Sequence, residues 1–304
     1  MVTGSFKPLL GIMRGLRFHL LVIAIYASVI SWLDIQYHLE IYNFPVSIVI
    51  ATATVIGLLL AFRTNCSYDR WWEARTIWGA IVNDSRTWVR QLLEFHDPGK
   101  TNPPAEPGTE LRGMAKRQIA WCYALSRSLR GQDPTQDLAG LLDASEIEAY
   151  GESQNVPNAI LLRQGRELRD LYSSERLELF SYVELERTLK RLTDSMGGCE
   201  RIKNTVFPTS YSRMVNILIY LFVILIPFGL VNVPAGALIA TSISLSFAFL
   251  LIDRVALFLQ DPFDGHPSDT PMLTLSRTIE INIKQMLGET ELPESLKPVD
   301  GVLY

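Results

Sequence analysis

The chain has 304 residues, of which 48% are hydrophobic, and its mean hydropathy of +0.16 is higher than is usual for a soluble protein. This length allows one or two domains. A formal net charge of −4 gives no indication of nucleic-acid binding, so we expect no nucleic-acid partner.

Four apolar stretches are typical of membrane-spanning helices, which need about 20 apolar residues. The first, residues 18–33, is short and contains His19. To cross a membrane it must extend to Arg17 and past Asp34, whose polar groups would reach the lipid headgroups. The second, residues 44–62, has no charged residue, and the third and fourth cover residues 215–231 and 235–252. Because apolar runs of this length are rare in soluble cores, we interpret them as four spans rather than buried core helices.

Lysine and arginine lie on one side of the predicted spans. They precede the first and third spans and follow the second and fourth, at Lys7, Arg14, Arg17, Arg63, Arg70, Arg75, Arg213 and Arg254. The connectors 34–43 and 232–234 contain neither residue type. By the positive-inside rule, both termini and the long middle segment are expected in the cytoplasm, with two helical hairpins crossing the membrane.

The middle segment, residues 63–213, is polar, and its apolar residues follow a helical rather than a strand period. Proline and glycine divide it into helices predicted at 111–129, 145–151, 159–172 and 177–202, the second beginning after Asp143. A further helix is predicted at 273–287. We therefore predict an all-α fold with an N-terminal membrane hairpin (1–62), a cytosolic helical domain (63–213), a second membrane hairpin (214–253), and a cytosolic C-terminal helix and tail (254–304).

Residues that carry chemistry form no catalytic pattern. The four histidines are scattered, and neither an HExxH motif nor a glycine-rich phosphate loop is present. The cysteines Cys66, Cys122 and Cys199 are far apart and form no CxxC pair, which disfavours a disulfide framework or a zinc site. We predict that the chain is not an enzyme and has no cofactor and no metal site.

The second span continues without glycine or proline from residue 61 to residue 78, which predicts one helix running from the membrane into the cytosol. Trp71, Trp72 and Trp78 in this stretch suit either the membrane interface or a packed helical domain. Taken alone, the stretch also fits ordinary juxtamembrane anchoring.

Three motifs, in order around the four spans, resemble the bestrophin family. Residues 62–75 read Phe-Arg-Thr-Asn-Cys-Ser-Tyr-Asp-Arg-Trp-Trp-Glu-Ala-Arg, similar to the segment after the second membrane helix of that family. Residues 198–202, Gly-Cys-Glu-Arg-Ile, are similar to the bacterial bestrophin pattern before the third span. Residues 261–263, Asp-Pro-Phe, resemble the Asp/Asn-Pro-Phe-Gly element after the fourth, with Asp264 in place of glycine. The matching positions are Arg63, Asn65, Tyr68, Asp69, Arg70, Trp71, Glu73, Arg75, Asp261, Pro262 and Phe263.

This resemblance implies a homopentamer around one central pore, with a narrow hydrophobic neck lined by the second membrane helix. By position, the neck residues would be Thr54, Leu58 and Phe62, whose i, i+4, i+8 spacing places them on one helical stripe. Rings of Leu58 and Phe62 would form a constriction that can gate by dewetting, and Thr54, smaller than the residue of animal members, would soften it. A second, cytosolic aperture maps to Val183. Core packing remains the alternative for Leu58 and Val183.

The resemblance also implies an ion channel for monovalent ions, and we favour anions such as chloride because animal and plant members conduct them. A cation-selective channel of the same fold stays open, since the proposed neck is uncharged. A membrane-anchored scaffold protein, whose helical domain would bind a partner, also stays open. The expected partners are membrane lipid, the permeant ions and further copies of the chain, in a bacterial plasma (inner) membrane. Animal members bind calcium in an acidic run after Pro-Phe-Gly. Here Asp264 and Asp269 offer few of the oxygen ligands that calcium prefers, so a solvated loop is expected.

Overall fold

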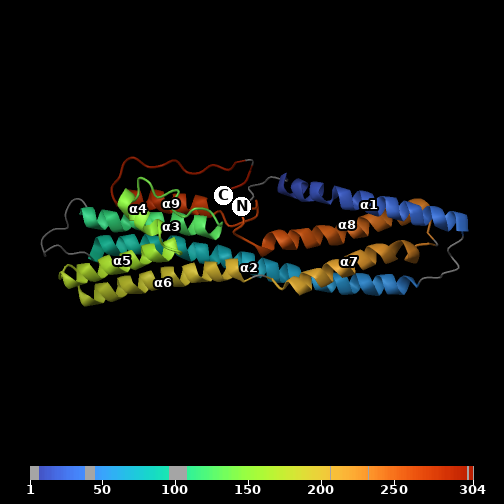
Figure 1. Ribbon diagram of the computed structural model, residues 1–304, viewed down its shortest axis with the longest axis horizontal. Helices are drawn as coiled ribbons and strands as arrows, with labels where there is room; N and C mark the ends of the chain where they lie inside the picture. Colours follow the sequence, from blue (N-terminus) through green and yellow to red (C-terminus); the bar gives the residue numbers. More distant parts are fainter. Residues whose placement is uncertain are drawn as a thin grey trace. The chain divides into compact units, whose positions relative to one another are not determined.

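The computed structural model describes residues 7–37, 45–95, 108–205, 207–231, 233–299 and 301–303. Over these residues the fold is all-helical, with no strand beyond two isolated bridges, which confirms the predicted fold class (Figure 1). The helices are α1 (Lys7–Tyr37), α2 (Val46–Phe95), α3 (Thr109–Leu129), α4 (Ala144–Gly151), α5 (Val156–Ser173), α6 (Leu179–Asn204), α7 (Thr209–Gly229), α8 (Ala235–Gln260) and α9 (Met272–Met286).

The helices group into two compact units. The first, here called the span unit, comprises Gly4–Trp71 and Thr205–Asp261. The second, here called the polar unit, includes Trp72–Asn204 and Pro262–Tyr304. Helix α2 is continuous over 50 residues and contributes its N-terminal half to the span unit and its C-terminal half to the polar unit. The continuous helix expected from residue 61 to residue 78 is therefore present.

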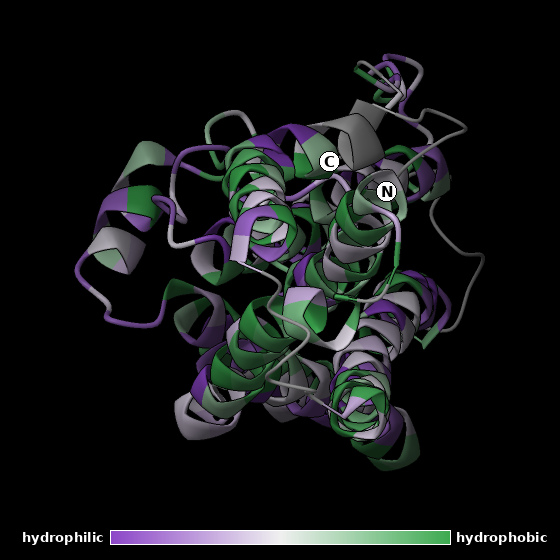
Figure 2. Cartoon of the chain, turned by 90° about the vertical axis from the view of Figure 1, so that its right-hand side faces the viewer, coloured by the Kyte–Doolittle hydropathy of each residue, from purple (hydrophilic) through white to green (hydrophobic). Residues whose placement is uncertain are grey.

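The span unit contains helices long and apolar enough to cross a membrane. Among the described residues there are four candidate spans, Gly11–Tyr37, Val46–Phe95, Thr209–Gly229 and Ala235–Gln260, as expected from the sequence. The short apolar run at 18–33 belongs to a helix of 31 residues, which removes its apparent deficit in length. Large apolar side chains remain exposed along all four helices, as a lipid environment allows (hydrophobic residues are green in Figure 2).

Packing in the span unit brings α1 against α8 and α7, and α7 against α8. The core contains residues of α2 and α7 such as Ile56, Leu60, Ile219 and Phe222. At its C-terminal end α7 approaches α2 closely, because a Cβ atom at Gly229 would lie 2.6 Å from Val49 Cγ2. Glycine at this position therefore sets how closely the two helices approach.

In the polar unit, α3 is the central helix and packs against α5, α6 and α9 (Figure 1). The core of the polar unit is built around Trp78, Trp88 and Trp121, which are fully buried. Trp78 thus serves the packed helical domain rather than the membrane interface. The predicted helices of this unit agree with α3, α4, α5, α6 and α9 to within a few residues at each end, and Asp143 precedes α4 as its N-cap residue.

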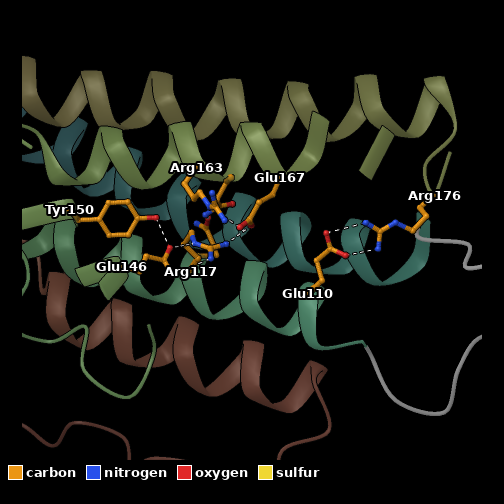
Figure 3. Close-up of polar contacts among 9 residues, drawn as sticks. Glu110, Arg117, Glu146, Tyr150, Arg163, Glu167 and Arg176 are labelled. Atoms are coloured by element: carbon orange, nitrogen blue, oxygen red, sulfur yellow. Dashed lines mark hydrogen bonds and ion pairs between the residues drawn. The ribbon is translucent and has the colours of Figure 1, made fainter. Parts of the chain in front are cut away.

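A buried charge network joins α3, α4 and α5 (Figure 3). Arg117 donates from Nε to Glu146 Oε1 at 2.6 Å and also pairs with Glu167. Tyr150 Oη donates to Glu146 at 2.6 Å, and Arg163 Nε donates to Glu167 at 2.9 Å. Burial alone would raise the pKa of Glu146, but the hydrogen bonds from Arg117 and Tyr150 hold it below its ordinary value. Burial raises the pKa of Glu167 despite the charge of Arg117.

Candidate functional site

The predicted neck residues lie on a face of α2 that the chain itself leaves open. Leu58 is 68% exposed and Phe62 57%, and Thr54 is also exposed, whereas Leu60 on another face is only 1% exposed. The Thr54 hydroxyl donates to the Ile50 carbonyl oxygen at 2.9 Å, so its hydrogen is satisfied within the helix. This stripe has the exposure that a pore-facing or lipid-facing surface requires, and its role in a neck stays a prediction.

A buried ion pair lies directly beside this stripe. The side chain of Arg63 is completely buried, and its Nη1 lies 2.5 Å from Oδ1 of Asp253 on α8, whose side chain is 6% exposed. The guanidinium carbon is 5.9 Å from the centroid of the Phe207 ring. Because a lone charge is costly in apolar surroundings, each partner needs the other. Asp253 had no predicted role, although it directly follows an apolar run, as Arg63 does.

Contacts from α7 hold the same part of α2. Tyr211 Oη donates to the carbonyl oxygen of Leu59 at 2.9 Å, and its ring centroid lies 5.8 Å from that of Phe62. Tyr211 thus contacts both Leu59 and Phe62, which lie about one turn apart on α2. Phe62 nevertheless stays 57% exposed. The arrangement gives Phe62 a defined position and an open face.

Among the motif residues, Arg70 connects two chain segments within the span unit. Its Nε donates to the carbonyl oxygen of Gln260 at 2.9 Å and its Nη1 to that of Thr205 at 2.7 Å. Its Nη2 lies 3.8 Å from Oδ1 of Asp261. Arg70 therefore ties the start of the segment before α7 to the end of α8, which is a scaffolding role.

The remaining motif residues divide between packing and exposure. Phe263 is 1% exposed in the core of the polar unit, and the Pro262 carbonyl oxygen accepts from the amide of Thr270 at 3.1 Å. Glu73 pairs with Arg201 in the polar unit. The rings of Tyr68 and Trp71 lie 5.8 Å apart, Arg75 is half-buried, and Asn65 and Asp69 are exposed.

Val183, the predicted aperture residue, lies in the polar unit near the start of α6 and is 37% exposed. Leu179 and Phe180, one turn earlier, are 54% and 83% exposed. These three residues, here called the α6 patch, form an exposed apolar surface outside the spans. The sequence analysis predicted Val183 alone. The nearby pair of consecutive large apolar residues, Leu179 and Phe180, could also have indicated an apolar surface here.

The loop after the Pro-Phe element is not the solvated loop that was expected. Asp269 is only 3% exposed, and its Oδ2 accepts from the amides of Gly265 at 2.7 Å and His266 at 2.9 Å. Gly265 has a φ of +92°, which favours glycine. Asp264 pairs instead with Lys203 Nζ at 2.5 Å. Burial raises the pKa of Asp269 to about 6. Among the described residues, no group of three or more His, Cys, Asp or Glu side chains is placed to hold a metal ion.

Comparison with known proteins gives a consistent result. Residues 8–285 match a family described as Bacterial/Fungal Bestrophin protein. A voltage-dependent anion channel-forming protein of Ralstonia nicotianae is 33% identical over 263 residues, which cover 86% of this chain and 82% of that protein. The voltage-dependent anion channel-forming protein YneE of Escherichia coli strain K12 is 31% identical over 80% of this chain and 77% of its own length. The crystal structure of a bacterial bestrophin homolog from Klebsiella pneumoniae aligns with a TM-score of 0.81 and 30% identity, over 91% of this chain and 100% of that one.

Proposed function

This chain belongs to the bacterial and fungal bestrophin family, and we propose that it is one subunit of a channel that passes monovalent anions such as chloride through a single central pore. It is a multi-pass membrane protein, and its relatives named above are described as voltage-dependent anion channel-forming proteins. The observation that carries the proposal is the exposed stripe of Thr54, Leu58 and Phe62, on a helix that buries Ile56 and Leu60 on another face.

The pore requires several copies of the chain, and five is the number that the family resemblance implies. A single exposed stripe encloses no path, whereas stripes from several subunits around an axis do. Leu179 and Phe180 of the α6 patch support assembly independently, because an apolar surface outside the spans is not covered by lipid and is expected to contact another protein surface. In this assembly the segments 63–213 and 254–304 lie in the cytoplasm, and the membrane is the bacterial inner membrane.

In the proposed mechanism an ion loses part of its hydration at the rings of Leu58 and Phe62. The barrier then depends on the width and wetting of the neck. Arg63 lies beside Phe62, but its pair with Asp253 leaves the site without net charge, so it supplies no ring of fixed positive charge. Val183 would form the second constriction. No catalytic role is assigned to any residue.

Recording single-channel currents in a planar bilayer under a potassium chloride gradient tests the function. We expect discrete openings with a reversal potential close to that of chloride. A reversal potential close to that of potassium would favour the cation-selective alternative of the same fold. An absence of current from correctly assembled protein, with Leu58→Ala also silent, would favour the membrane-anchored scaffold.

A further inference from the structure

A pocket of about 530 Å³ lies within the polar unit, between α3, the turn that follows it, α9 and the C-terminal tail. Helices α3 and α9 pack side by side (Figure 1). Residues 136, 137 and 139–141 of the turn and Leu296 of the tail complete the wall. Its volume is within the range of small-molecule sites, which is about 300–1,000 Å³. No residue of the proposed neck or aperture lines it.

Five charged side chains line this pocket, and the cations outnumber the carboxylates. Arg127 Nε pairs with Asp137 at 2.6 Å. Lys284 Nζ lies 2.9 Å from Glu280 Oε1, and Arg277 Nε lies 3.4 Å from Glu280 Oε2. Three cations therefore face two carboxylates, and one positive charge is in excess.

The carboxylate of Glu280 has several hydrogen-bond and ion-pair partners, whereas the Nε of Arg277 lacks a hydrogen-bond acceptor. Tyr123 Oη donates to Glu280 Oε2 at 2.7 Å, in addition to the contacts from the two cations. Burial and this hydrogen bond raise the pKa of Tyr123, which keeps it a donor. The Nε of Arg277 is buried, and its approach to Glu280 does not meet hydrogen-bond geometry, so it has no hydrogen-bond partner. A buried donor without an acceptor is costly and is normally satisfied by water or by another polar group.

Part of the remaining wall is apolar, alongside the polar side chain of Gln136. Leu141, Leu273 and Leu296 come from the turn, from α9 and from the tail respectively. A bare inorganic anion would leave this side of the pocket unused, because hydrated ions gain nothing from leucine side chains. A ligand with an anionic end and a short apolar body would contact both sides.

We propose that this pocket binds a small organic anion, a carboxylate or phosphate ester carrying a short apolar body. The anionic group contacts Arg277 and Lys284, and the apolar body contacts Leu141, Leu273 and Leu296. Since a single excess charge is available, one anionic group per ligand is favoured over several. The site is separate from the ion path, so it exists whether or not the chain is an anion channel.

Titration calorimetry on the full-length protein in detergent tests this site with butyrate, butylammonium and inorganic phosphate as probes. Butyrate should bind saturably at one site per chain. Butylammonium, with the same apolar body and opposite charge, should not bind, and inorganic phosphate should bind more weakly than butyrate. Equal binding of butylammonium, or tighter binding of phosphate, would overturn the assigned ligand class.

Variants locate the binding. Arg277→Gln and Lys284→Gln should each weaken butyrate binding at least tenfold, whereas Lys190→Gln, an exposed lysine of α6 paired with Asp194, should leave it unchanged. Ala139→Phe, at an exposed position on the pocket wall, fills the pocket without removing a charge and should abolish binding even if the charge variants do not fold. Unchanged binding in Ala139→Phe, or its loss in the neck variant Leu58→Ala, would place the ligand elsewhere and reject the proposal.

Discussion

The side chains of Leu58 and Phe62 differ from their neighbours on α2 in what surrounds them. Both are largely exposed, whereas Leu60 is buried in the core of the span unit and Leu59 is half-buried with its carbonyl oxygen bonded to Tyr211. A change on one face should therefore act on the proposed pore, and a change on the other should act on packing.

Replacing Leu58 or Phe62 with alanine should raise conductance or open probability, because a wider neck admits water. Leu60→Ala should leave the current per channel unchanged and lower stability by about 2–5 kcal/mol, the usual cost of a buried cavity. Bilayer currents and thermal unfolding of the purified variants measure both effects. If Leu59→Ala or Leu60→Ala changes the current while Leu58→Ala and Phe62→Ala do not, the pore face has been assigned to the wrong side of α2.

The pair of Arg63 and Asp253 should behave as a unit. Asp253→Ala leaves a buried guanidinium without its carboxylate, so we expect a loss of about 3–5 kcal/mol. Combining Arg63→Met with Asp253→Leu removes both charges and should recover most of that loss. Asp261→Ala is the control, since its carboxylate is 42% exposed and 3.8 Å from Arg70, and it should cost at most about 1 kcal/mol. Thermal unfolding in detergent compares them; a double variant no more stable than Asp253→Ala would contradict the pairing.

Asp269 should make stability fall as the pH rises. Its pKa in the folded chain, about 6, is above the ordinary value of 3.8, so the folded state holds the proton more tightly than the unfolded state does. The contribution is fully present below about pH 4 and is lost as the pH passes through about 6. Asp269→Asn cannot ionise and should be more stable than the parent at pH 7, by on the order of 2 kcal/mol, with a smaller difference at pH 4. Unfolding midpoints at both pH values decide this, and a difference that does not depend on pH would contradict it.

Helices α3, α4 and α5 are held together by polar as well as apolar contacts, and Arg117 is the centre of the polar set (Figure 3). Its side chain is 8% exposed, and the two carboxylates that it pairs with are 21% and 14% exposed. Removing it would leave Glu146 without its ion-pair partner and Glu167 with Arg163 alone.

Arg117→Ala should therefore destabilise the polar unit by about 3–5 kcal/mol. The loss should be larger at pH 8 than at pH 5, because protonation of the two carboxyls relieves their repulsion. Arg169→Ala on α5 is the matched control: that side chain is 66% exposed and 3.5 Å from Asp170, so its loss should cost at most about 1 kcal/mol. Chemical unfolding of both variants at the two pH values measures this. Equal stability of the two variants would mean that the network contributes little.

Assembly is the property on which the channel proposal depends most. Light scattering of the purified protein, after subtraction of detergent, should give a closed oligomer, most simply of five subunits. Phe180→Ser in the α6 patch should shift the protein towards smaller species because it removes apolar contact area, whereas Met286→Ser, also exposed at 39%, should not. A monomer for the unmodified chain would contradict the single central pore.

Several features followed from the sequence because they are recorded in residues close together along the chain. The four spans are long apolar runs, and the helices of the polar unit are bounded by proline, glycine and Asp143. The bestrophin resemblance depended on a contiguous stretch, residues 62–75, with two short landmarks. The neck stripe was predicted from its position in the bestrophin resemblance, and the structure adds that this face is exposed.

Only the tertiary structure decided which distant residues meet. Arg63 and Asp253 are 190 positions apart, and Tyr123 and Glu280 are 157 apart. The spacing of apolar residues shows which face of each helix is buried. It does not show which other helix covers that face, or at which position along the helix the two make contact. The sequence therefore determined the spans, the helical class and the family. The buried ion pairs, the enclosed Asp269 and the cationic pocket between α3 and α9 depend on how the helices pack, because a buried charge can persist only where packing brings its partner within contact distance.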